Sequence, residues 1–583
     1  MFRKLGRRIR RFAGARAAAA GRFIMRSRPV RWLAGQHAVR VAIRILVLLW
    51  NLLARYLWWP VKRLVRRVRK FMGRHEVWYW VAAWAGCAVL AWGILQASPQ
   101  QVVAPVLGLF VLAVIARRLE LGIVALMITT ASFINPSAIP RPITAGGMGP
   151  NVAELLIVFM LIAVFLQFST RRKFELFKSP LTLPLLLLCA AVLISMLVSY
   201  VNYLGDPRGI WPFERVYNSV RQMFLYLLFF PIAFGIRTER QLNLTLRLLI
   251  WVAAMVAIMM VIQYFLGTDK SLFIGTRFTP GYTTALSPEE EKVARSLPPG
   301  IALMLAFFLV PLAQAAYRGL RAGIVPATAA SVVGAGLIFT FARNYWISMF
   351  VGVFVIWLLA NRTVKSRLAM VAVVVAVFSV VGSLSLAKLA PGTAGERFSR
   401  ALSERFVSLI HRPTYTVGES FQSRLRENRS AIQQIKRSPV FGIGADAPRQ
   451  YGEWTRPGLW TKVIYPVYFI HNSYLELWMV YGLIGILSFI WMSIAFLLRA
   501  FVLSRRARDP TWRILAISFF AGYVAFLIRA AVTMNATHEM HNIAVAALMW
   551  GIVEAIWRLN EQAQADAKAA SVPVQAEPAV VRV

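Results

Sequence analysis

Cysteine and acidic residues are scarce in this chain. Its 583 residues include two cysteines, Cys87 and Cys189, and this number excludes a disulfide framework and argues against a cysteine-based metal site. Both lie in apolar segments, where cysteine is an ordinary small core residue. Asp and Glu number 24 against 66 Lys and Arg, and no Asp-x-Asp pair occurs in a loop predicted to face outward. Walker-type phosphate loops and dinucleotide-binding fingerprints are absent as well.

Long apolar runs, by contrast, are abundant. Hydrophobic residues make up 58% of the chain, and its mean hydropathy is +0.60. About fourteen runs are apolar enough to cross a bilayer as helices. They are Val77–Gln96, Val102–Ala116, Leu121–Ile134, Leu155–Phe168, Leu181–Tyr203, Met223–Gly235, Leu248–Phe265, Ile301–Ala316, Ile324–Phe341, Trp346–Ala360, Leu368–Leu386, Ser473–Leu498, Ile514–Val532 and Ile543–Trp557. The pattern predicts an all-α, polytopic integral membrane helix bundle.

The net charge of +42 raises the question of a nucleic-acid partner, but the placement of the charges argues against one. Basic residues cluster in alternate loops, and short loops rich in Lys and Arg stay cytoplasmic. These loops lie around Arg117, Arg171–Lys173, Arg237–Arg247, Arg318–Arg321, Arg362–Arg367 and Arg499–Arg513. Threading the spans through the membrane with these loops inside predicts that both termini are cytoplasmic.

The N-terminal segment Met1–Glu76 is a basic arm. Its apolar part, Val41–Trp59, has basic residues along one helical face and leucines elsewhere, which predicts an amphipathic helix lying in the membrane plane. Such a surface suits anionic lipids of the inner leaflet. A nucleic-acid-binding arm is a weaker alternative because the segment is tethered to the bilayer. The arm has no cleavable signal-peptide pattern.

The charge and hydropathy pattern divides the chain into five regions. After the arm come a first set of membrane helices (77–388), a large outward loop (389–472), three last helices (473–557) and a disordered cytoplasmic tail (558–583). The loop is much longer than usual connectors and carries the candidate catalytic elements. Within it, Ser423–Lys436 is predicted to be helical and to stop before Gly442 and Gly444. These glycines either bring the backbone close to a ligand or simply end the helix.

Two basic side chains stand out at the predicted outer surface. His471, followed by Asn472, lies where the large loop meets the next span, and a titratable imidazole at that position is well placed for chemistry. Its alternative is a helix-end histidine hydrogen-bonded at the interface. Arg343 lies outside against the positive-inside trend, and its rigid guanidinium fork suits phosphate oxygens. Its alternative is an arginine that snorkels to the interface.

Weaker candidates lie in other outward segments. Arg277 and Arg221 are candidate secondary anion contacts, although the sequence favours solvated loop charges for both. His538 and His541 would share a helical face and could share a metal ion. A third ligand is not evident, so the sequence favours interfacial polar residues there, and no metal or other cofactor is expected.

Four motifs in order resemble the O-antigen ligase and polysaccharide polymerase superfamily. They are Thr340–Arg343, Ser423-Arg424-Leu425, Pro439–Gly444 and the run from His471 to Gly485, and Gly275–Gly281 is similar to a further loop motif of that family. The resemblance covers about Gly147–Trp557 and is sharpest over Phe339–Gly485. The sequence departs from the family at Ala342, where serine is usual, and in the basic arm.

The resemblance implies a glycosyltransferase of the bacterial inner membrane with its active site on the periplasmic side. The donor would be a glycan linked to undecaprenyl diphosphate, and the acceptor a hydroxyl of lipid A–core or a related molecule. His471 would be the catalytic base, while Arg343 and Arg424 would bind the diphosphate. Arg277, Arg221, Asn472, Gly442 and Gly444 are the predicted substrate-binding residues. The transfer would be metal-independent and would invert the anomeric centre.

Three alternatives stay open at the level of the sequence. A polymerase that joins repeat units onto a growing glycan would share the same motifs. A membrane transporter is a different class, but no internal repeat of the kind found in transporters is evident. A structural membrane protein that recruits partners through its basic arm would not need the charged outer-loop residues.

Overall fold

The structure is a computed structural model that describes the larger part of the chain. The described residues are 111–134 except 116, 151–171, 179–204, 213–266, 271–274, 298–319, 322–371, 373, 402, 416–445 and 470–570. Contacts divide the chain into two units, Met1–Pro105 and Val106–Val583, and all described helices belong to the second. The predicted basic arm, the first predicted span and Arg277 lie outside the described residues.

Every named element of the described part is a helix, and the single β-bridge there joins Ile134 to Ile274. The all-helical prediction is therefore confirmed. Within this part, six helices are long and apolar enough to cross a membrane. They are α9 (Thr182–Leu204), α12 (Glu239–Leu266), α13 (Ile301–Arg318), α19 (Ser473–Arg506), α20 (Pro510–Ala530) and α21 (Met540–Ala570). These six candidate spans support a polytopic membrane protein, and the total of about fourteen spans stays a prediction.

Shorter helices occupy most of the other predicted spans in the described part. Four of them are apolar: α7 (Leu119–Thr130), α8 (Val152–Arg171), α14 (Ile324–Ile338) and α15 (Arg343–Leu359). The predicted span Met223–Gly235 is instead a 3₁₀ helix, η3 (Arg221–Leu228), followed directly by α11 (Phe229–Gly235). It is preceded by α10 (Phe213–Val220). The last helix also continues beyond the predicted end at Trp557, as far as Ala570.

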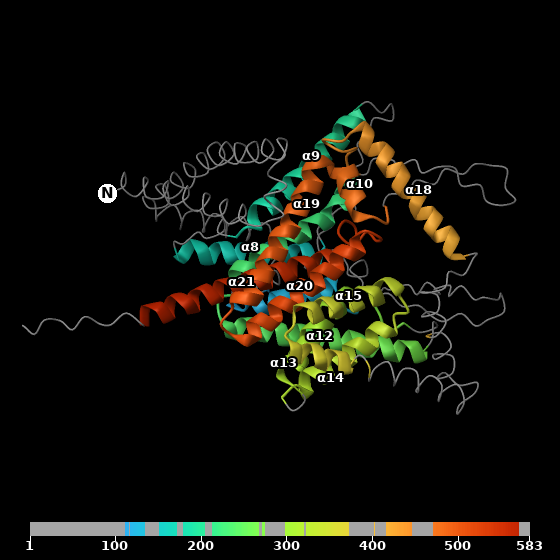
Figure 1. Ribbon diagram of the computed structural model, residues 1–583. Helices are drawn as coiled ribbons and strands as arrows, with labels where there is room; N and C mark the ends of the chain where they lie inside the picture. Colours follow the sequence, from blue (N-terminus) through green and yellow to red (C-terminus); the bar gives the residue numbers. More distant parts are fainter. Residues whose placement is uncertain are drawn as a thin grey trace, which may run out of the picture. The chain divides into compact units, whose positions relative to one another are not determined.

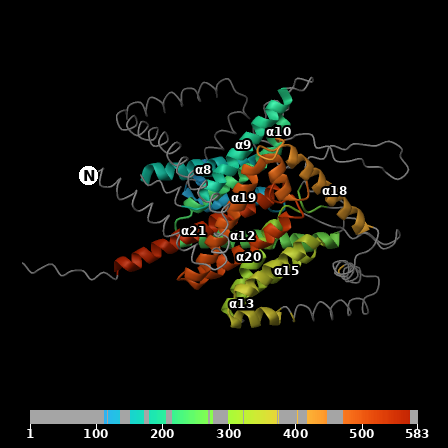
Figure 2. The same cartoon turned by 45° about the horizontal axis from the view of Figure 1, so that its top comes forward.

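Helix α19 packs between other long helices of the bundle. Helix α19 contacts α9 and α20, and α20 in turn packs against α13 and α15. Figures 1 and 2 show α19 in orange beside α9, and α15 close to α20. Aromatic rings fill the interior, where Trp550 of α21 stacks on Tyr226 with a centroid distance of 5.0 Å. This interior fixes the helix ends from which the site is built.

Helix α19 is broken at Gly482, and a loop inserts into the break. Gly482 has φ 67° and ψ −168°, a conformation open essentially to glycine only. The break frees backbone groups that the loop after α18 (Thr416–Arg437) then satisfies. Ile443 donates to the carbonyl of Met479 at 2.8 Å, and the amide of Leu483 donates to the carbonyl of Val440 at 3.0 Å.

Glycines at this junction allow three backbones to meet. A methyl group at Gly482 would lie 2.1 Å from the Val440 carbonyl oxygen, and one at Gly442 would lie 2.5 Å from the Val480 carbonyl oxygen. Gly444 approaches the backbone of Ser199 on α9 in the same way, at 2.8 Å. The junction therefore attaches the end of α18 to both α9 and α19.

Candidate functional site

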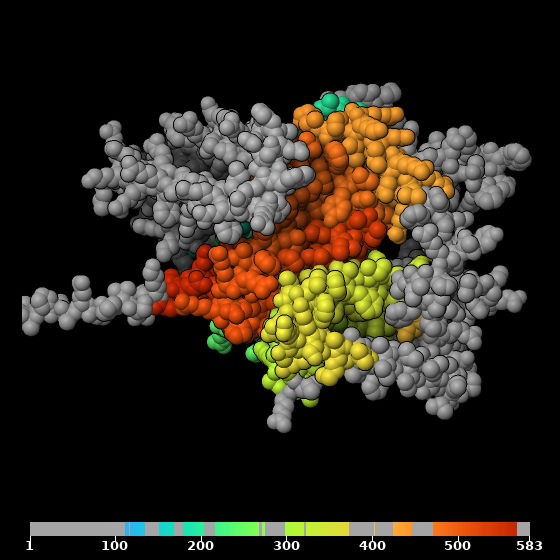
Figure 3. All heavy atoms as spheres, viewed as in Figure 1, coloured from blue at the N-terminus to red at the C-terminus, as the bar shows by residue number. Residues whose placement is uncertain are grey.

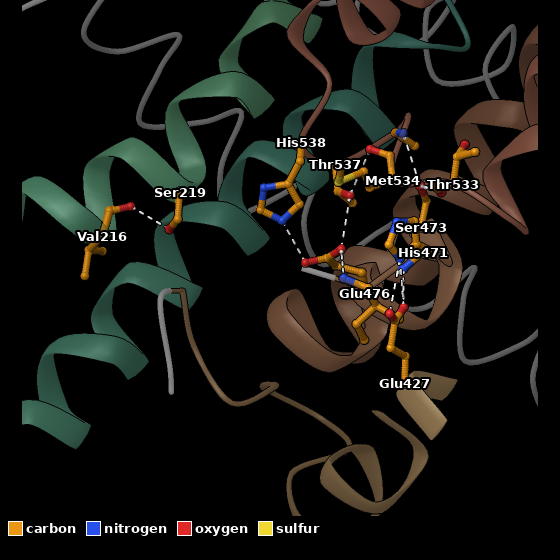
Figure 4. A network of polar contacts seen from close by, with 12 residues as sticks. Val216, Ser219, Glu427, His471, Ser473, Glu476, Thr533, Met534, Thr537 and His538 are labelled. Carbon is orange, nitrogen blue, oxygen red and sulfur yellow. Dashed lines mark hydrogen bonds and ion pairs between the residues drawn. The ribbon is translucent and has the colours of Figure 1, made fainter. Parts of the chain in front are cut away.

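His471 is held by a carboxylate from α18. The Nδ1 atom of its ring lies 3.0 Å from Oε2 and 3.3 Å from Oε1 of Glu427, and its backbone amide donates to the same Oε2 at 3.0 Å. Figure 4 shows the Glu427 carboxylate reaching the ring from α18. The His471 side chain is 35% exposed, and that of Glu427 is 13% exposed. Since Nδ1 donates to the carboxylate, Nε2 becomes the basic nitrogen of the ring.

The surroundings of Glu427 favour its ionised form. Burial by itself would raise the pKa of Glu427, but the hydrogen bonds from His471 and the charges of His471 and Arg424 outweigh it, and the pKa is lowered. The stabilisation from this carboxylate is therefore present above its ordinary pKa and is lost only as the pH falls through the lowered value. A carboxylate of this kind orients an imidazole and stabilises it when it takes up a proton.

Two arginines interact electrostatically near this pair. Arg424 lies one helical turn before Glu427 on α18, and its charge acts on both Glu427 and Arg343. Arg343 is the first residue of α15 and is partly buried. Figure 3 shows the surface hollowed between α18 in orange, the red turn that precedes α21 and α15 in yellow-green. A shared diphosphate site for the two arginines stays a prediction.

Local geometry at the start of α15 favours an anion. Ala342 is the N-cap residue and offers no side-chain acceptor, so the positive end of the helix dipole and the Arg343 guanidinium lie together at this end of α15. The preceding residue, Phe341, has φ 48°, which is unusual for a bulky side chain. Its ring is buried against Trp346 and Tyr264. This aromatic packing stabilises the turn that immediately precedes Arg343.

Asn472 has a clear structural task next to His471. Its side-chain oxygen accepts hydrogen bonds from the amides of Tyr474 and Leu475, both at 3.2 Å, and so caps the N-terminus of α19. The cap fixes where the helix begins and therefore the direction in which the chain leaves His471. A contact of Asn472 with substrate stays a prediction.

The other predicted binding residues lie in different surroundings. Arg221 forms an ion pair with Glu154, with its Nε 3.3 Å from Oε1, so its charge is balanced within the protein. Gly442 and Gly444 pack against the backbones of α19 and α9. This close packing explains why glycine is found at both positions. Their contacts with substrate also stay predictions.

Glu427 is the residue of this site that sequence reasoning missed. The sequence holds a signal for it, because Glu427 follows Arg424 by three residues and thus shares its face of the predicted helix. Nothing in the sequence, however, says that this face meets His471, which follows 44 residues later.

Removal of the Glu427 carboxylate tests its orienting role. We expect Glu427→Ala to lower kcat by about 10- to 100-fold, less than the loss of the base itself, because the imidazole remains but is no longer held or stabilised when protonated. Glu427→Gln keeps an acceptor for Nδ1, so its kcat should lie between those of wild type and Glu427→Ala. The measurement is single-turnover transfer by purified protein. The exposed Arg426 on the same helix supplies the control Arg426→Ala, and equal losses in both variants would refute the orienting role.

Comparison with known proteins gives one family match over the segment that holds these residues. A family model described as O-antigen ligase matches residues 328–490, a range that contains Arg343, Arg424, Glu427 and His471. A solved structure described as "Structural coordination of polymerization and crosslinking by a peptidoglycan synthase complex" is similar at 18% identity and a TM-score of 0.34, covering 64% of this chain and 98% of that chain. The comparison with curated proteins gives no match. The match over residues 328–490 supports the resemblance of this chain to the O-antigen ligase and polysaccharide polymerase superfamily.

Proposed function

We propose that this protein transfers a glycan from undecaprenyl diphosphate to a hydroxyl of an acceptor such as lipid A–core. The observation that carries the proposal is a histidine held by a carboxylate of α18, with Arg424 on that same helix and Arg343 at the start of α15. Such a site offers a base for a neutral hydroxyl and positive charge for a diphosphate leaving group. The periplasmic side of the inner membrane is the proposed location, with both termini in the cytoplasm.

The proposed reaction is a single displacement. His471 Nε2 accepts the proton of the acceptor hydroxyl while its oxygen forms a bond to the anomeric carbon of the donor. The bond between that carbon and the diphosphate oxygen breaks, and undecaprenyl diphosphate leaves with the electron pair. Attack from the face opposite the leaving group inverts the anomeric centre. Glu427 stabilises the imidazolium that forms at His471.

The arginines have the complementary task in this reaction. Negative charge grows on the leaving diphosphate as the glycosidic bond breaks, and fixed guanidinium groups stabilise that charge without reorganisation. Arg343 and Arg424 repel each other when no anion lies between them, so a bound diphosphate relieves this repulsion. Two arginines can thereby fill the role of a divalent metal ion, and the proposed transfer is metal-independent.

The direct test uses purified protein in vesicles with a glycan linked to undecaprenyl diphosphate. Transfer to added lipid A–core, with release of undecaprenyl diphosphate, supports a ligase. Lengthening of the lipid-linked glycan itself supports the alternative function, a polymerase that uses the same donor. Absence of both products, with the donor shown to be bound, would refute glycan transfer.

Arg424→Lys tests the diphosphate role within the same assay. We expect the rate of transfer to fall by about 10- to 100-fold, because an ammonium group cannot reproduce the paired hydrogen bonds of a guanidinium to phosphate oxygens. Arg426→Lys is the matched control, since Arg426 lies on the same helix and is exposed. Wild-type rates in the Arg424 variant would remove Arg424 from the proposed mechanism.

A further inference from the structure

A second pair of carboxylate and imidazole lies behind the first. Glu476 of α19 is 1% exposed, and its Oε1 lies 2.7 Å from Nε2 of His538, in the turn between α20 and α21. Its Oε2 accepts a hydrogen bond from the amide of Ile470 at 3.1 Å and one from Thr537 Oγ1 at 3.4 Å. A buried carboxylate is costly unless several donors satisfy it, and here three donors from two segments do so.

These bonds act on the backbone immediately before His471. The amide of Ile470 donates to Glu476, and the next amide, that of His471, donates to Glu427. Two consecutive amides are therefore bonded to two different carboxylates, one from α19 and one from α18. Figure 4 shows Glu427 at His471 and Glu476 between His471 and His538. Displacement of either carboxylate would release one of these amides. The backbone at Ile470 and His471 could then turn and carry the imidazole with it.

The same turn holds the residue on the other side of His471. Ser473 donates to the carbonyl of Thr533 through its amide at 3.2 Å and through Oγ at 2.8 Å. Its Oγ in turn accepts from the amide of Ala536 at 3.2 Å. Ser473 and Glu476 thus dock this segment on residues 533–538, and the Ile470 amide on the other side of the histidine is held by Glu476.

We propose that Glu476 and His538 form a positioning pair that fixes the backbone of His471 and thereby the direction of its imidazole. This inference rests on the proposed function, since it assigns the pair to the base of that reaction. Neither residue needs to touch substrate in this role. His538 satisfies and orients the Glu476 carboxylate, and Glu476 holds the Ile470 amide.

The arrangement also bears on the alternative of a metal ion shared by His538 and His541. The two histidines face different carboxylates, since His541 Nε2 lies 3.7 Å from Oε2 of Glu539. Among the described residues, no group of three or more His, Cys, Asp or Glu side chains is arranged to hold a metal ion. His541 therefore provides a matched control of the same residue type, three positions further along the chain.

The test compares His538→Ala, His538→Gln and His541→Ala in the full-length protein. We expect His538→Ala to lower kcat at least tenfold with the donor KM changed less than twofold, and His538→Gln, whose amide can still donate to Glu476, to recover most of the loss. His541→Ala should keep the wild-type kcat. Equal losses in the alanine variants, or no recovery by glutamine, would overturn the positioning role.

Hydrogen exchange supplies a readout that needs no turnover. Peptides covering Ile470 and His471 should exchange faster in His538→Ala than in wild type, while peptides from α13 should keep their wild-type exchange. Unchanged exchange at Ile470 would overturn the inference even if glycan transfer were established. If the wild-type protein transfers no glycan but the exchange difference is present, the proposed function fails. The positioning of the His471 backbone by Glu476 and His538 is then still supported.

Discussion

Replacing His471 by alanine is expected to lower the rate of glycan transfer by about 10²–10⁴-fold, the contribution of a well-placed general base. The acceptor hydroxyl is a poor nucleophile until its proton is removed, and Glu427 holds the His471 ring with Nε2 as the basic nitrogen. The measurement is single-turnover transfer in vesicles at saturating donor. A wild-type rate for this variant would rule out His471 as the base.

The control for this variant is the binding of the donor. Since the arginines rather than the histidine are assigned to the diphosphate, His471→Ala should bind undecaprenyl diphosphate with an affinity within about threefold of wild type. Its thermal unfolding should also stay close to wild type, because the imidazole is partly exposed. Loss of donor binding together with activity would mean that the substitution disturbs the whole site.

Gly482→Ala is expected to destabilise the protein by about 3 kcal/mol or more, since alanine is strained in this conformation and the loop that fills the helix break loses its hydrogen bonds. The added methyl group would lie 2.1 Å from the Val440 carbonyl oxygen, which is backbone and cannot rotate away. Displacing this loop shifts α18, so transfer should fall as well. Thermal unfolding in detergent and the transfer assay measure the two effects.

Gly522→Ala is the matched substitution for this prediction. Gly522 lies inside α20, and a methyl group there would meet its nearest side-chain atom, Met549 Sδ, at 3.4 Å, an ordinary contact. Alanine also has the higher helix propensity, so this variant should be as stable as wild type or more stable. Equal stability of the Gly482 and Gly522 variants would show that the break in α19 tolerates a side chain.

The helices follow from the sequence where the apolar runs are long. Hydropathy predicts α9, α13 and α20 to within a few residues, because each must satisfy its backbone within one continuous apolar segment. Helix α18 is polar, and its predicted range Ser423–Lys436 follows from its start and stop residues instead. The structure extends it at the start to Thr416.

The parts of the site that the sequence did not predict are contacts between distant segments. His471 and Arg343 stand out because histidine and arginine are unusual at the outer ends of apolar helices. Glu427 becomes a functional candidate, and His538 a partner of Glu476 rather than of His541, only when α18 and the turn before α21 are folded against the start of α19. Neither hydropathy nor spacing encodes such contacts. The break at Gly482 was missed for the same reason, since its partner is the Val440 backbone.

The left-handed residue Phe341 links the predicted anion site at Arg343 to α12, a helix that contributes an aromatic ring rather than a charge. A bulky residue with positive φ costs on the order of 1–3 kcal/mol and persists only where its surroundings compensate. The ring of Tyr264, near the end of α12, lies 5.7 Å from that of Phe341. Arg343 follows Phe341 by two residues, so the direction of its guanidinium depends on an aromatic ring far away in the sequence. A change in the packing of α12 would therefore alter the direction of the Arg343 guanidinium and with it the predicted affinity for phosphate.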